Sequence, residues 1–475
     1  MAWLGAVASA WGAAEAAPAN PVQAKLAALR AKPNIIFILA DDLGYGELGC
    51  YGQERIRTPN LDRMAAEGTR FTQCYAGSTV CAPSRAALMT GRHTGHVSIR
   101  GNAAVPLSPA EPTVAEVLKG AGYQTALIGK WGLGLARTVS SPDRRGFDEF
   151  FGFLSQTHAH DYYPDHCWRS SVAGDFALQK LPLPGNLEGA RGQYIHDLFT
   201  RAATNFVRVS KNQPFFLYLA YTIPHAHNEL KDRGMQVPSD APYSREDWPE
   251  QERNKAAMIT RMDRDIGWLL AELRRHRIDS NTVVFFSSDN GPHNEGGAKA
   301  AYFRSAGPLR GNKRDLTEGG IRVPMIVRWP GHVPAGRVSD QVWAFWDFLP
   351  TAAALAGVKA PTGVDGVSMV PALLGGKQTN QHEFLYWEFH ENGSKQAVRM
   401  GDWKGIRAAP GAPLQLYALR EDLGETNNVA SAHPAVVARM EDYLKGARTE
   451  SEWWPLRKAG EAAKGPKPPQ ERTAP

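Results

Sequence analysis

The stretch NIIFILADD, at residues 34–42, decides the fold class. Residues 35–40 are apolar without a break, and two aspartates follow them. Three further runs are apolar along most of their length: PFFLYLAY at 214–221, TVVFFSS at 282–288 and VPMIVRW at 323–329. Unbroken runs, unlike alternating ones, are typical of strands buried on both faces of a parallel sheet. We therefore expect these four runs to be strands of one parallel sheet.

Helical patterns lie between these runs. PTVAEVLKGAGY, at 112–123, begins with Pro-Thr and ends at Gly122, as a capped helix does. The stretch 253–278 presents one apolar face at helical spacing, made of Met258, Met262, Ile266, Leu269 and Leu273. Strands that alternate with helices indicate a doubly wound α/β domain, which we place at residues 33–375.

The remaining part of the chain has a different pattern. Short, partly alternating runs at 382–389, 395–407 and 414–419 predict an antiparallel sheet. PAVVARMEDYLKGAR, at 434–448, predicts one amphipathic helix. We therefore expect a small C-terminal α+β subdomain at 376–457, followed by a disordered tail at 458–475 that is rich in proline and charge.

Length and charge exclude some classes of function. The 475 residues suffice for one large α/β domain and a smaller one. The formal net charge is +6, acidic and basic residues are mixed, and there is no basic arm, which argues against a nucleic-acid partner. No apolar run is long enough to span a membrane.

The N-terminal segment predicts export. Residues 1–22 are rich in alanine and resemble the apolar and cleavage regions of a secretory signal, although the basic segment that normally precedes them is missing. We expect a periplasmic or secreted bacterial protein; the alternative is a disordered alanine-rich leader. Four cysteines, at positions 50, 74, 81 and 167, have no regular spacing and form no disulfide framework.

Two of the predicted strands end in oxygen-bearing side chains. Asp41 and Asp42 follow the first run, and Asp289 and Asn290 follow the run at 282–288. Ligands bind beyond the carboxyl ends of strands in open α/β sheets, and carboxylates this close together repel unless a cation separates them. Oxygen ligands favour Ca²⁺ or Mg²⁺ over zinc. The alternative is that each pair only forms a turn or a helix cap.

Cys81 heads another predicted helix. In TVCAPSRAALMTGR, at 79–92, Pro83 suits a first helical turn and Gly91 a helix end. Cys81 therefore lies near a helix N-terminus, where thiolates and bound anions are stabilised, and Arg85 is one turn away. The residues alone leave four alternatives for Cys81: a buried apolar residue, a disulfide partner, a metal ligand or a nucleophile.

Several motifs together resemble those of a known family. CAPSRAALMTGR, at 81–92, is similar to the C-x-P-S-R-x-x-x-[LM]-T-G-R element of the sulfatases, in the alkaline phosphatase superfamily. ILADDLGYGELGCYG, LIGKWGLG, SSDNG and GPLRGNKRDLTEGGIRVP resemble other sulfatase blocks in the family's order. The pattern is most similar to bacterial arylsulfatases and N-acetylgalactosamine-6-sulfatase-like enzymes. The resemblance implies a large mixed, mostly parallel sheet between helices.

The resemblance also implies a mechanism. The motif cysteine, here Cys81, is oxidised to formylglycine (3-oxoalanine) by a formylglycine-generating maturation enzyme. The hydrated aldehyde attacks the sulfur of the ester, releases the alcohol, and then eliminates inorganic sulfate. The implied substrate is a sulfated carbohydrate or an aryl sulfate. The implied cofactor is Ca²⁺, with Mg²⁺ as the alternative.

Individual roles follow from the same resemblance. Asp41, Asp42, Asp289 and Asn290 match the metal ligands, and Cys81 stands at the metal as the nucleophile. Arg85 would hold the nucleophile's hydroxyl and neutralise the sulfate, and Lys130 and Lys313 would contact sulfate oxygens. His225 matches the histidine near the leaving-group oxygen, and His227 is its competitor.

Two features remain open at the level of sequence. Gly132, in GKWGLG, stands where the family commonly has a histidine that contacts the nucleophile and the ester, so His225 acts alone or another residue fills the gap. The loop QTHAHDYYPDHCW, at 156–168, is a pocket wall, a second metal site or a polar surface loop.

Two rival functions remain. One is a phosphonate or phosphate ester hydrolase that uses the same nucleophile and metal. The other is a non-catalytic protein that binds sulfated glycans.

Overall fold

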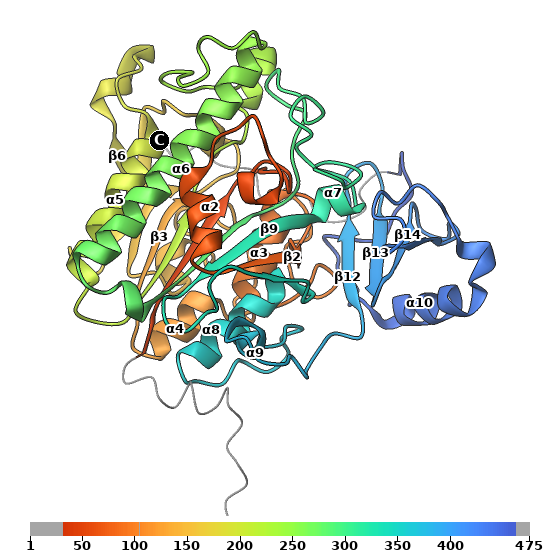
Figure 1. Ribbon diagram of the computed structural model, residues 1–475. Helices are drawn as coiled ribbons and strands as arrows, with labels where there is room; N and C mark the ends of the chain where they lie inside the picture. Colours follow the sequence, from red (N-terminus) through yellow and green to blue (C-terminus); the bar gives the residue numbers. More distant parts are fainter. Residues whose placement is uncertain (1–31, 104, 462–475) are drawn as a thin grey trace, which may run out of the picture.

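The computed structural model describes residues 32–103 and 105–461. It consists of a large twisted sheet between two layers of helices, with a second, smaller sheet at one side (Figure 1). The predicted leader at 1–22 and most of the predicted tail at 458–475 lie outside the described residues. In the described part, no helix combines the length and apolar character needed to cross a membrane.

The large sheet has eleven strands in the order β10-β2-β9-β8-β1-β7-β3-β4-β5-β6, with β11 paired to β2. The strands are β1 (Asn34–Ala40), β2 (Thr69–Tyr75), β3 (Gln124–Lys130), β4 (Glu149–Phe153), β5 (His166–Ser171), β6 (Phe176–Pro182), β7 (Phe215–Ala220), β8 (Thr282–Ser288), β9 (Arg322–Arg328), β10 (Arg337–Ser339) and β11 (Trp343–Ala344).

The centre of this sheet is parallel and fully buried. Strands β8, β1, β7 and β3 are neighbours and run in one direction. Every residue of β1, β7, β8 and β9 is buried, as the unbroken apolar runs predict. The orientation expected for 323–329 is wrong, because β9 pairs antiparallel with both β8 and β2. A parallel pair needs a crossover connection, usually a helix, that brings the chain back to the end of the sheet where the first strand began. No long helix lies among the described residues between β8 and β9, so β9 runs in the opposite direction.

Helices cover both faces of the sheet. One face carries α2 (Pro59–Ala66), α5 (Ile195–Ser210) and α6 (Glu250–Arg275), and the other carries α3 (Cys81–Thr90), α4 (Val114–Gly120), α8 (Phe348–Leu355) and α9 (Val370–Leu373). Alternate residues of β1 separate the two cores: Ile36 and Ile38 face α5 and α6, whereas Ile35 and Phe37 face α3 and α8. This arrangement confirms the predicted mixed, mostly parallel α/β architecture and its two predicted helices.

The C-terminal sheet is antiparallel, as predicted. It contains β12 (Leu385–Phe389), β13 (Lys395–Met400), β14 (Trp403–Arg407) and β15 (Gln415–Ala418), and α10 (Pro434–Gly446) packs on it. The indole of Trp387 donates to the Ala76 carbonyl at 2.9 Å, so this sheet rests directly on the large one. The division at residue 375 stays a prediction.

Short elements complete the described part of the chain. They are α7 (Glu318–Ile321) and the 3-10 helices at Gly49–Tyr51, Pro142–Arg144, His158–His160, Pro184–Gly189, Asn228–Arg233, Asp279–Asn281, Phe345–Asp347 and Ala430–Ala432.

Candidate active site

The central parallel strands deliver polar side chains to one edge of the sheet. Ala40 of β1 is in register with Ser288 of β8, so Asp41 and Asp289 emerge side by side. Lys130 is the last residue of β3, and His225 follows β7. Because parallel strands end at a common edge, residues far apart in the sequence meet there.

Hydrogen bonds lock the acidic side chains together. Asp42 has a left-handed backbone (φ +66°), and its N–H donates to Asp289 Oδ1 at 3.0 Å. Asn290 Nδ2 donates to Asp42 Oδ1 at 2.7 Å. An aspartate held at positive φ is uncommon and marks a position whose surroundings impose the conformation.

Each carboxylate also meets a buried cation. Lys130 Nζ lies 2.7 Å from Asp41 Oδ2, and Lys313 Nζ lies 2.8 Å from Asp42 Oδ2. The Arg85 guanidinium, from the second turn of α3, donates to Asp289 Oδ2 from Nε at 3.0 Å and from Nη2 at 2.8 Å. All six side chains are nearly or completely inaccessible to solvent.

The electrostatics of this cluster suit a divalent cation. Burial, and then the charge of Asp41, raise the pKa of Asp289 to about 7 in spite of Arg85. Asn290 Oδ1 is buried and has no hydrogen-bond partner among the described residues. An oxygen atom without a partner beside crowded carboxylates is a ready ligand for a hard cation such as Ca²⁺. The side chains of the predicted ligand set therefore fit a bound divalent cation.

Cys81 is the first residue of α3 and is buried beside this cluster. Its Sγ donates to Asp41 Oδ1 at 3.4 Å. Burial, and then the charge of Asp41, raise the pKa of the Cys81 thiol well above its usual range. The stabilisation expected from the helix N-terminus is therefore outweighed, and the thiol stays protonated and weakly nucleophilic. Cys50, Cys74 and Cys167 are free thiols as well.

The structure brings His225 into the cluster and places His227 elsewhere. His225 Nε2 lies 3.1 Å from Lys313 Nζ and 3.4 Å from Asp42 Oδ2. Its Nδ1 lies 2.6 Å from the Ala226 carbonyl oxygen, so Nδ1 carries the proton and Nε2 faces the site. Burial, and then Lys313, lower the pKa of His225 to about 3. His227 Nδ1 instead pairs with Gln236 Oε1 at 2.9 Å.

Two residues at the site were not predicted as functional from the sequence. His160 stacks on His225, with ring centroids 4.6 Å apart and an interplanar angle of 12°, and its Nδ1 lies 3.2 Å from Glu229 Oε1. Glu295 Oε2 lies 3.2 Å from Lys313 Nζ. His160 belongs to the His-rich loop at 156–168. The composition of this loop indicated a possible pocket wall, but it did not show which residue contacts His225.

At Gly132, the space of the missing side chain is filled by the side chain of Gln156. It adopts φ +72°, and a Cβ built on it would lie 2.2 Å from Gln156 Nε2. Gln156 Nε2 donates to the Gly132 carbonyl at 3.2 Å, and its Oε1 is buried without a partner among the described residues. The amide of Gln156 thus occupies the space into which a side chain at position 132 would project.

Comparison with known proteins identifies the family. A model of the sulfatase family matches residues 33–358, and a model described as N-sulphoglucosamine sulphohydrolase, C-terminal, matches residues 311–450. The chain belongs to the sulfatase family, and it is an enzyme that hydrolyses sulfate esters. The resemblance read from the motifs is thereby confirmed.

Named relatives and a solved structure agree with this assignment. The chain is 35% identical over 396 residues to the N-acetylgalactosamine-6-sulfatase of Sus scrofa, covering 78% of this chain and 71% of that protein. It is 33% identical over 463 residues to the arylsulfatase A of Homo sapiens, covering 86% of each. The crystal structure of Ps i-CgsB in complex with k-i-k-neocarrahexaose superposes with a TM-score of 0.75 and 33% identity, covering 87% of this chain and 92% of that one.

Proposed function

We propose that this sulfatase removes sulfate from a sulfated carbohydrate, with formylglycine formed from Cys81 and with Ca²⁺ held by Asp41, Asp42, Asp289 and Asn290. The observation that carries the proposal is a buried Cys81, whose Sγ donates to Asp41, set among three carboxylates and three cations. A solved neighbour bound to a neocarrahexaose and relatives named for N-acetylgalactosamine 6-sulfate support a sugar substrate.

The acidic residues would hold the metal, with Mg²⁺ as the alternative to Ca²⁺. A bound divalent cation would neutralise the carboxylates and polarise a sulfate oxygen. The unpartnered Asn290 Oδ1 supports its inclusion in the ligand set. Lys130 forms an ion pair with Asp41, and Lys313 forms one with Asp42. From these positions both ammonium groups can donate hydrogen bonds to the oxygens of a bound sulfate.

Position 81 needs chemistry that its thiol lacks. A hydrated aldehyde there would supply a hydroxyl nucleophile, and a maturation enzyme of the host would have to form the aldehyde. Arg85 lies one helical turn away and is held by Asp289, so its guanidinium is fixed beside the reacting group. Arg85 thus orients the nucleophile and offsets the charge of the sulfate.

His225 and Lys313 form the proton-carrying pair. With Nδ1 committed to Ala226, His225 accepts a hydrogen bond at Nε2 from Lys313. Lys313 Nζ carries the proton, and it can pass this proton to the departing oxygen directly or through His225 Nε2. His160 covers one face of the His225 ring and limits its rotation.

Paired release assays test the function. Inorganic sulfate and inorganic phosphate are measured after incubation of the protein with an aryl sulfate and the matched aryl phosphate and phosphonate. We expect faster release of sulfate, and loss of at least about a thousandfold in Cys81→Ala. Faster release of phosphate would support the phosphonate or phosphate ester hydrolase. Glycan binding without any release would support the binding protein.

We also propose export to the periplasm or beyond the cell, on the sequence of residues 1–22. Edman sequencing of the protein from its native host should begin after the leader. An N-terminus at Met1 would contradict the proposal.

A further inference from the structure

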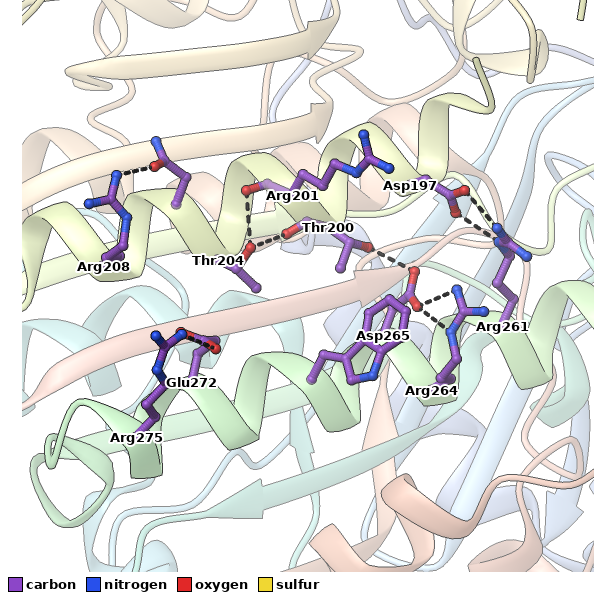
Figure 2. Close-up of a pocket in the computed structure, with 12 residues that line it drawn as sticks. Asp197, Thr200, Arg201, Thr204, Arg208, Arg261, Arg264, Asp265, Glu272 and Arg275 are labelled. Carbon is purple, nitrogen blue, oxygen red and sulfur yellow. Dashed lines mark hydrogen bonds and ion pairs between the residues drawn. The ribbon is translucent and has the colours of Figure 1, made fainter. Parts of the chain in front are cut away.

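A groove lies between two helices on the outside of the molecule (Figure 2). It has a volume of about 590 Å³, and all of its wall comes from α5 and α6. None of its lining residues belongs to the cluster around Cys81. The groove is therefore distinct from the catalytic pocket.

Positive charge dominates the groove. Three acidic residues line it, Asp197, Asp265 and Glu272, together with five arginines, Arg201, Arg208, Arg261, Arg264 and Arg275. Figure 2 shows the arginines of both helices along its length. Five cations against three anions leave an excess of two positive charges.

Three of the five arginines form ion pairs with acidic residues of the groove, and two do not. Arg261 Nε and Nη2 donate to Asp197 at 2.8 and 2.6 Å, and Arg264 Nε donates to Asp265 Oδ1 at 2.8 Å. Arg275 pairs with Glu272 at 3.2 Å.

The two arginines left over are Arg201 and Arg208, both exposed on α5. Arg208 Nη2 donates to the neutral Asn205 Oδ1 at 2.7 Å. In the part of the chain that the structure describes, neither guanidinium has an acidic partner. Apart from the bond of Arg208 to Asn205, their donors are therefore free for an external anion.

An exposed aromatic ring completes the wall. Trp268 is 52% exposed, and it is the one tryptophan in the exposed class among the described residues. Arg264 Cζ lies 4.3 Å from its ring centroid, so the guanidinium covers one face of the indole and leaves the other face for a ligand. A large apolar ring kept in water beside cations suits a ligand with both a flat apolar face and negative charge.

We propose that this groove binds an anionic, sulfated stretch of polysaccharide outside the active site. The sugar ring stacks on Trp268, and Arg201 and Arg208 donate to sulfate oxygens. This inference rests on the proposed substrate class. A second contact on the same chain raises the concentration of sulfate esters near the catalytic site.

Binding and catalysis are tested separately. Affinity for dextran sulfate, with neutral dextran of equal length as the reference, is measured by calorimetry. The proteins compared are the wild type, Arg201→Gln/Arg208→Gln, Trp268→Ala and the control Arg274→Gln, which removes an exposed arginine of α6 outside the groove. Turnover of a small aryl sulfate and the thermal midpoint are measured for each protein.

We expect the double variant to bind dextran sulfate about tenfold more weakly, and Trp268→Ala about threefold more weakly. Arg274→Gln should stay within about twofold of the wild type, and turnover of the aryl sulfate should not change. If the wild type binds dextran sulfate but does not turn over the aryl sulfate, the result would support the groove as a binding site and would contradict the proposed function.

Three results would overturn the inference. The double variant could bind as tightly as the wild type, or Arg274→Gln could weaken binding as much as the double variant does. Double-stranded DNA of equal charge could also bind more tightly than dextran sulfate through the same two arginines, which would make the groove a nucleic-acid site.

Discussion

Gly132 illustrates how one residue shapes the reaction pocket. The position combines a left-handed backbone with a neighbouring amide, Gln156, in the space of its missing side chain. A side chain at this position would therefore be strained by the backbone and would have to displace the end of the Gln156 side chain. In the proposed mechanism the proton chemistry would fall to the pair of His225 and Lys313, which the structure holds in contact.

We expect Gly132→His to lower stability by about 1–3 kcal/mol, because it forces a non-glycine residue to positive φ and displaces Gln156. Sulfate release should fall with it. Chemical denaturation and initial rates measure the two effects. Gly120→Ala is the control, since a Cβ on Gly120 meets open space. A Gly132→His enzyme with wild-type stability and rate would contradict this account of the position.

Asn290 is the residue that tests the proposed metal site. After chelation, added Ca²⁺ should raise the thermal midpoint of the wild type, because a ligand that binds only the folded state stabilises it by about 2.7 kcal/mol at 100 times its Kd. Asn290→Leu should abolish the shift, since it removes the unpartnered Oδ1. Gln156→Ala, which leaves the acidic residues intact, should keep the shift. An equal Ca²⁺ response in Asn290→Leu would refute the ligand assignment.

At the scale of elements, strand β12 ties the small sheet to the large domain through a buried acid. Glu388 accepts hydrogen bonds from Arg100 at 2.9 Å, Arg448 at 2.9 Å and His390 at 3.0 Å. Burial alone would raise the pKa of Glu388, but His390 and the two arginines lower it to about 2. Removal of such an acid leaves buried cations without a partner.

The stability of the protein should therefore depend on pH through Glu388. Its pKa is depressed on folding, so its contribution is full above the unfolded value of about 4.5 and is lost as the pH falls toward 2. Glu388→Gln should cost about 3 kcal/mol at pH 7 and less at pH 3, as measured by urea unfolding. The control is Glu383→Gln, whose side chain is 65% exposed in its pair with Arg439. If the loss of stability in Glu388→Gln does not change with pH, the Glu388 carboxylate is not the source of the pH dependence.

At the scale of the whole molecule, the sequence predicts what depends on local pattern. Unbroken apolar runs identify β1, β7 and β8, and the acids that end β1 and β8 meet because the strands are parallel and in register. The alternation at 382–419 likewise predicts the antiparallel sheet. The resemblance to sulfatase motifs points to Cys81, Arg85 and Lys130, which the structure brings together.

Other features depend on tertiary position and could not be predicted in this way. The antiparallel direction of β9 follows from the path of the chain after β8, which no apolar pattern records. The stack of His160 on His225 and the contact of Gln156 with Gly132 join loops 65 and 24 residues apart. The groove between α5 and α6 appears only when the two helices lie side by side.

The mass of the tryptic peptide Phe71–Arg85, measured on protein purified from its native host, decides whether Cys81 acts as formylglycine. We expect a peptide that is lighter than the cysteine form and that reacts with carbonyl reagents. A peptide that carries only unmodified Cys81 would contradict it.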